Sequence, residues 1–91
     1  MTINYYKKRP LGKFTISRFI LHNDWRIMKD LMSRVVVVGC HMDFVSDCMC
    51  YTAFSDEFDD VEEGVEPPFY MCEMYRESDG STHMTKFIKG K

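Results

Sequence analysis

The chain has 91 residues, of which 45% are hydrophobic and 14% aromatic, so we expect one small domain with a packed core. The net charge of −2 is unevenly distributed, because residues 1–34 carry +6 and residues 35–91 carry −8. No stretch has the roughly 18 apolar residues that a membrane-spanning helix needs, and no apolar leader is visible. The composition therefore predicts a cytoplasmic protein whose four cysteines stay reduced.

A turn signal and an apolar alternation predict the first elements. Residues 3–8 suit a short edge strand, and Pro10 and Gly12 then mark a turn. Residues 13–21 form the next strand candidate. Asn23 is a good N-cap residue, so a helix is expected to begin there. Five apolar side chains recur at three- and four-residue spacing along this helix and predict one buried stripe: Trp25, Ile27, Met28, Leu31 and Met32.

Residues 34–44 give the strongest strand prediction because they contain four consecutive valines, whose β-branched side chains disfavour a helix. We expect this strand to begin buried on both faces and to end half exposed. A second strand, residues 47–54, is expected after a turn near Ser46. Strict alternation along the first strand predicts one face made by Val36, Val38, Cys40, Met42 and Phe44 and another made by Val35, Val37, Gly39, His41 and Asp43.

The acidic run, which we define as residues 56–66, holds seven carboxylates in eleven residues. Like charges repel each other, so we expect this run to form a surface loop over residues 55–67. A hairpin over residues 69–88 follows, with Asp79-Gly80 as its turn signal. If these two residues form the loop, the expected cross-strand pairs are Glu73 with Lys86, Tyr75 with Met84, and Cys72 with Phe87.

The order of these elements predicts the fold class. One helix lies among several strands that follow one another through short turns, a pattern typical of α+β proteins. We therefore expect a single α+β domain over residues 1–91, in which an antiparallel sheet of about four to five strands carries one helix on a face.

Two cysteines are the first candidates for a metal site. Cys48 and Cys50 are two residues apart on an expected strand, so both thiols would point to one face, where Cys40, Cys72 or a histidine could complete a zinc site. The C-x₂-C spacing of structural zinc sites is absent. Three of the cysteines lie in apolar runs, so we favour buried core thiols, keep a small zinc protein as the second alternative, and expect no cofactor.

Signatures of catalysis and of calcium binding are absent from the sequence. It contains no G-x-S-x-G, no P-loop and no G-x-G-x-x-G. The acidic run lacks the alternating oxygen ligands and central glycine of an EF-hand loop. A contact between His41 and Asp43 on one strand face would more often be structural than catalytic. We therefore expect a protein that is not an enzyme.

The N-terminal segment is the candidate for nucleic-acid binding. It combines aromatic side chains, which stack on bases, with cations, which neutralise phosphates. The sequence pI near 5.9 argues against this function, and the segment could instead pair with the acidic run. A nucleic-acid-binding module is therefore the alternative function, with Tyr5, Tyr6, Lys7, Lys8 and Arg9 as its residues.

The acidic run is the preferred candidate for a binding site. Apolar residues are interleaved with its carboxylates, unlike in a purely solvating tail. Pro67-Pro68 stiffens its exit, which reduces the entropy lost on docking. Carboxylates around apolar anchors suit a basic surface on a partner protein, including a surface that normally binds nucleic acid. The expected partner-binding residues are Asp56, Glu57, Phe58, Asp59, Asp60, Glu62, Glu63 and Glu66, with Phe54 as a second anchor.

No segment matches a family signature. In size and composition only, the chain resembles the compact single-domain inhibitors that bacterial viruses encode, many of which occlude a host or defence protein. This resemblance implies a nucleic-acid mimic that acts in the cytoplasm of a host cell. The sequence also leaves open a homodimer, because the terminal hairpin could expose a sheet edge that pairs with a second copy.

Overall fold

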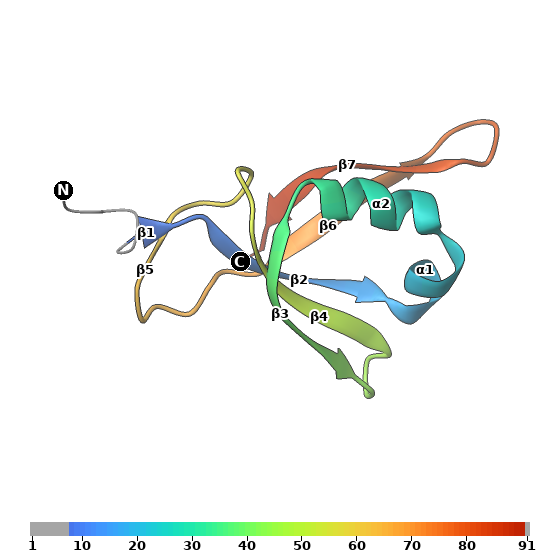
Figure 1. Ribbon diagram of the computed structural model, residues 1–91. Helices are drawn as coiled ribbons and strands as arrows, with labels where there is room; N and C mark the ends of the chain where they lie inside the picture. Colours follow the sequence, from blue (N-terminus) through green and yellow to red (C-terminus); the bar gives the residue numbers. More distant parts are fainter. Residues whose placement is uncertain (1–7, 91) are drawn as a thin grey trace.

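A computed structural model describes residues 8–90, and it shows an α+β fold with antiparallel sheets and two short helices (Figure 1). The largest sheet has the strand order β2–β4–β3, with β2 over Leu11–Ser17, β4 over Cys48–Phe54 and β3 over Val36–Asp43. Both strand pairs in this sheet are antiparallel, and the strand order leaves β3 at an edge. The strand expected over residues 3–8 lies outside the described residues except for Lys8.

Two smaller sheets flank the three-stranded sheet. β6 (Tyr70–Arg76) and β7 (Thr82–Lys89) form the expected hairpin. β1 (Lys8–Arg9) pairs with β5 (Val61–Glu62), so the acidic run contains a short strand as well as loop. The backbone N–H of Lys13 donates to the carbonyl of Pro68 at 2.9 Å and thereby joins β2 to the chain entering β6.

Two helices stand where one helix was expected. The chain leaves β2 at Ser17, whose hydroxyl accepts a hydrogen bond from the Ile20 N–H and begins α1 (Arg18–Asn23). Asp24, rather than Asn23, is the N-cap residue of α2 (Trp25–Ser33). The strand prediction for residues 13–21 is therefore wrong beyond Ser17, because a side-chain cap satisfies the backbone of a new helix there.

The apolar stripe of α2 is confirmed for four of its five residues. Ile27 and Leu31 are buried, while Met28 and Met32 pack against the core. Trp25 is 66% exposed because it occupies the first position of the helix, beyond the edge of the core. Within residues 8–90, neither helix has the length and apolar character needed to cross a bilayer.

Arg34 ties the end of α2 to the hairpin. Its guanidinium donates to the carbonyls of Thr85 at 2.9 Å and Met84 at 3.1 Å on β7. The same group bonds Asp30 one helical turn earlier and lies 3.6 Å from the Glu57 carboxylate. α2 therefore covers one side of β7, and Figure 1 shows the helix alongside that strand.

A β-bulge changes the expected faces of β3. The register shifts between Val37 and Gly39, so Val38 has no partner on β4 and the alternation reverses there. Val37 consequently shares a face with Cys40 and Met42, while Val36 lies with His41 on the other face. The expectation that β3 begins buried is also wrong: Val36 is 66% exposed, because β3 is an edge strand without a covering layer at its start.

A second bulge corrects the terminal hairpin. The pairs Cys72–Phe87 and Glu73–Lys86 are confirmed. Beyond them the register shifts by one residue, so Tyr75 faces His83 instead of Met84. The extra residue is Thr85, whose hydroxyl donates to the Glu73 carbonyl and carboxylate. The Glu77 N–H donates to the Ser81 carbonyl and closes the loop, so the loop is longer than the two residues Asp79-Gly80.

Five aromatic rings form the centre of the core. The Phe58 ring stacks on Tyr70 at a centroid distance of 4.4 Å and meets the edge of Phe87 at 4.8 Å. Phe14 lies 5.3 Å from Tyr51 and 5.2 Å from Phe87, which links the three-stranded sheet to the hairpin. Leu31 adds the contact with α2. The core thus joins α2, β2, β4, β6 and β7 into one hydrophobic cluster, to which β3 contributes no buried residue.

Candidate protein-binding surface

The acidic run follows the surface but is held from below by two buried apolar residues. Phe58 is 5% exposed and Val61 is 9% exposed. The Asp59 N–H also donates to the Tyr70 hydroxyl at 2.8 Å. These contacts hold the backbone on the core while the seven carboxylate residues of the run remain exposed. The run is therefore an ordered acidic surface rather than a freely solvated tail.

Three carboxylates of the acidic run have cationic neighbours. Asp59 accepts a hydrogen bond from Lys89 at 3.0 Å, and this bond raises the pKa of Lys89. Glu66 pairs with Lys13. Glu57 lies near Arg34, as described above. Four further acidic side chains form no ion pair among the side chains described for residues 9–90, and these are Asp56, Asp60, Glu62 and Glu63.

A hollow of about 380 Å³ opens in this surface. Asp60, Glu62 and Glu66 bring carboxylates to it, and Val65 offers an exposed apolar side chain. The geometry suits a long cationic side chain, because its aliphatic part can lie on an apolar wall while its charged end meets a carboxylate. Further lining residues are Asp59, Val61, Pro68 and Lys89.

The expected aromatic anchors are not available on this surface. Phe58 lies in the core, where its ring contacts Tyr70 and Phe87, so its expected role as a contact for a partner is wrong. Phe54 is half-buried, and the Arg9 guanidinium lies 5.6 Å from the centre of its ring. The exposed apolar residue of the acidic run is instead Val65.

The N-terminal candidates are only partly within the described residues. Tyr5, Tyr6 and Lys7 lie outside them. Lys8 is paired through its backbone with Glu62 and Arg9 with Val61, so these two residues run beside the acidic run. The Arg9 side chain covers Phe54, and its Nε is buried without a hydrogen-bond partner in the described part of the chain. Arg9 is the cation of this segment whose side chain the structure describes, and it faces protein.

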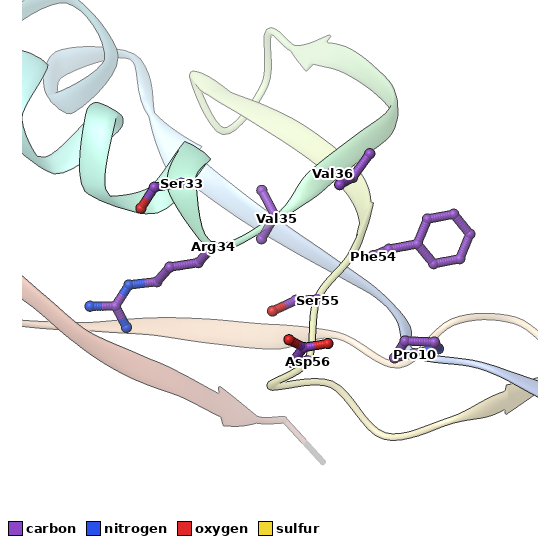
Figure 2. A pocket seen from close by; sticks show the side chains of 8 residues that line it. All are labelled: Pro10, Ser33, Arg34, Val35, Val36, Phe54, Ser55 and Asp56. Atoms are coloured by element: carbon purple, nitrogen blue, oxygen red, sulfur yellow. The ribbon is translucent and has the colours of Figure 1, made fainter.

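A second hollow, of about 210 Å³, lies between the end of α2, the start of β3 and the segment that follows β4. Figure 2 shows Val35 and Ser55 in this hollow, with the Arg34 guanidinium extending away from them. That guanidinium is already bonded to β7 and Asp30. The hollow therefore lacks a free cation, and its lining includes the Asp56 carboxylate and the Phe54 ring beside smaller polar and apolar groups.

The cysteine candidates separate into two places. Cys48 and Cys50 share a face of β4, as their spacing predicts, and Asp43 on β3 faces Cys48. One donor atom from each of these three residues lies within 4.8 Å of the other two. Hydrogen bonds from Ser46 and Val45 keep the pKa of Asp43 below its usual value.

The remaining thiols are remote from that group. Cys40 faces Tyr51 across the sheet, so it projects from the opposite face to Cys50. Cys72 is on β6, and burial raises the pKa of its thiol to about 12. The expected completion of a zinc site by Cys40 or Cys72 is therefore wrong, since the structure brings Asp43 to the pair instead.

β3 has an exposed apolar edge that the sequence pattern did not predict. Val38 is 54% exposed, and in the turn that follows the strand Phe44 is 86% and Val45 is 99% exposed. The apolar pair Phe44-Val45 lies within the β3–β4 turn, where polar residues are the usual choice. That composition was the available signal that this end of the molecule presents apolar surface to solvent.

Comparisons of the chain with protein-family models, with curated proteins and with solved structures found no match.

Proposed function

We propose that this chain is a non-enzymatic inhibitor that binds a protein, and that its acidic run covers a basic surface on the partner where a nucleic acid would otherwise bind. The hollow beside β5 carries this proposal, because Asp60 and Glu62, which form no ion pair among the side chains described for residues 9–90, lie there beside the exposed side chain of Val65. A lysine or arginine of the partner would enter the hollow. Charge attraction would make association fast and sensitive to salt.

The proposal is tested by reversing three charges of the acidic run in the full chain. The variant carries Asp60→Lys, Glu62→Lys and Glu63→Lys, and it leaves Asp59 to its bond with Lys89. Each exposed ion pair contributes about 0.2–1 kcal/mol, and reversal adds repulsion. Affinity for a fluorescent oligo-arginine peptide, measured by anisotropy at low salt, is therefore expected to fall at least about tenfold.

A control variant separates the position of the charges from their number. Glu73→Lys, Glu77→Lys and Asp79→Lys change the net charge equally, but these residues lie on the β6–β7 hairpin. The control is expected to keep most of the affinity for the peptide. Equal losses in the two variants would contradict the proposal. Binding of single-stranded DNA in preference to the peptide would also contradict it and would favour the N-terminal nucleic-acid function.

The exposed β3 edge favours a second candidate function, which is self-association. Residues 35–42 of this edge carry no Lys, Arg, Asp or Glu, so no such charged side chain disfavours pairing with another strand. Antiparallel pairing of β3 with β3 would join the three-stranded sheets of two copies. The terminal hairpin is less open, since α2 and Arg34 lie against β7.

Val38→Lys is expected to abolish a dimer that the unmodified chain forms at micromolar concentration. Two-fold pairing about the middle of β3 would bring the two new ammonium groups close together. Val65→Lys is the matched control, because Val65 is 55% exposed, nearly the same as Val38, and lies away from the edge. Sedimentation equilibrium measures the oligomeric state of the unmodified chain and of both variants. A monomeric unmodified chain, or equal dissociation of the two variants, would exclude the β3 dimer.

A further inference from the structure

The outer face of the three-stranded sheet gathers several metal-binding side chains near the β3–β4 turn. Cys48 and Cys50 project from this face of β4, and Asp43 projects from β3 opposite Cys48. Their donor atoms, two thiol sulfurs and a carboxylate oxygen, all lie within 4.8 Å of one another. Ligand atoms around one tetrahedral ion, with metal–ligand bonds of about 2.0–2.3 Å, lie about 3.3–3.8 Å apart, so small side-chain rotations would bring these three atoms to that separation.

A fourth donor is available on the same face. His41 faces Cys50 in the β3–β4 register. Directly paired residues of an antiparallel sheet project to the same side with their Cβ atoms about 4.5–5.5 Å apart. The imidazole of His41 is therefore placed to approach the cluster from the side of Cys50, opposite the turn. Its exposed position leaves it free to rotate toward the other donors.

We propose that Asp43, Cys48 and Cys50, with His41 as fourth ligand, bind one zinc ion at the turn end of β3 and β4. Two thiolates, a carboxylate and an imidazole are a donor set that favours zinc over magnesium or calcium, which prefer oxygen ligands alone. On binding, each thiol loses its proton to solvent, and the sulfur electron pair forms the bond to the metal. The ion would link β3 to β4 and so stabilise the turn that contains Phe44 and Val45.

The local backbone already shapes this site before any ion binds. The Asp43 carboxylate accepts hydrogen bonds from the backbone N–H of Val45 at 3.0 Å and of Ser46 at 3.4 Å, which hold it over the turn. Ser46 Oγ lies 2.9 Å from Cys48 Sγ. Asp47, in the left-handed conformation with φ of 58°, brings the chain sharply back into β4. These features limit the reorganisation that the metal would require.

Cobalt provides the test, because a Co²⁺ ion bound by thiolates gives a near-ultraviolet charge-transfer band whose intensity reports the number of sulfurs. The full chain is reduced, freed of metal with a chelator and titrated with Co²⁺, and zinc then competes for the site. We expect one Co²⁺ ion per chain and a charge-transfer band with the intensity of two thiolate ligands. Zinc should displace the cobalt completely. Less than about 0.1 equivalent of bound metal, or no charge-transfer band, would overturn the proposal, because thiolate zinc sites bind tightly.

Variants of the ligands identify the site. Cys48→Ser and Cys50→Ser are each expected to weaken zinc binding by at least about 100-fold, and Asp43→Asn and His41→Ala by at least about tenfold. Mutating residues that only hydrogen-bond to metal ligands already lowers metal affinity by about 10–100-fold. Cys40→Ser is the control on the opposite face and should bind as the unmodified chain does. Circular dichroism of the metal-free proteins verifies folding. Equal losses in the Cys40 and Cys48 variants would overturn the assignment.

Discussion

Replacing Phe58 with alanine is expected to lower the free energy of unfolding by about 3–5 kcal/mol, the usual cost of truncating a buried aromatic side chain. The ring is 5% exposed and packs against Tyr70 and Phe87 in the centre of the core. Its loss would leave a cavity and release the acidic run from the residues beneath it. Denaturant unfolding followed by fluorescence or circular dichroism measures the change.

Phe44→Ala is the matched control for this experiment. It removes the same atoms from a ring that is 86% exposed, so the expected change is within about 0.5 kcal/mol. A similar loss of stability in both variants would show that the position of Phe58 in the core is not the cause. An unchanged stability in Phe58→Ala would contradict the packing described above.

Gly12→Val is expected to lower the free energy of unfolding by about 1–3 kcal/mol or more, because the new side chain overpacks the core. A Cβ atom at Gly12 would lie 2.8 Å from ring carbons of both Phe58 and Tyr70. These rings are stacked on each other within the aromatic cluster, so neither can move without disturbing its neighbours. The midpoint of thermal unfolding is the measurement, and it should fall by several degrees.

Gly39→Val provides the contrast for Gly12→Val. Gly39 lies on the edge strand β3, and nothing lies within 4 Å of a Cβ atom built there. Valine also favours a strand more than glycine does, so stability should stay equal or rise slightly. Equal destabilisation by the two substitutions would mean that the close approach of Gly12 to the two rings does not account for the effect.

Local patterns predicted the hairpins well because the residues that specify a turn and its two strands lie close together in the sequence. The valine run placed β3, and the Asp79-Gly80 signal placed β6 and β7 to within a residue or two at their ends. The two bulges were missed because one extra residue leaves the composition of a strand unchanged. Thr85 adopts the bulge through contacts with Glu73, twelve positions earlier, which no short window contains.

The candidate sites were harder to predict because they depend on which elements meet in three dimensions. Phe58 stands in the most acidic part of the sequence, and only the packing of Tyr70 and Phe87 over it shows that it belongs to the core. The exposure of β3 follows from its place at the edge of the sheet, and periodicity along one strand does not report its neighbours. Asp43 joined the two cysteines through the same strand pairing.

The contacts of Arg34 have a consequence for how the chain folds. The pairs β3–β4 and β6–β7 connect residues that are close in sequence, so each can close quickly on its own. Arg34 meets the carbonyls of β7 about fifty residues further along the chain, which requires a long loop to close first. We therefore expect α2 to dock on the terminal hairpin late in folding, after the latter part of the chain has been synthesised.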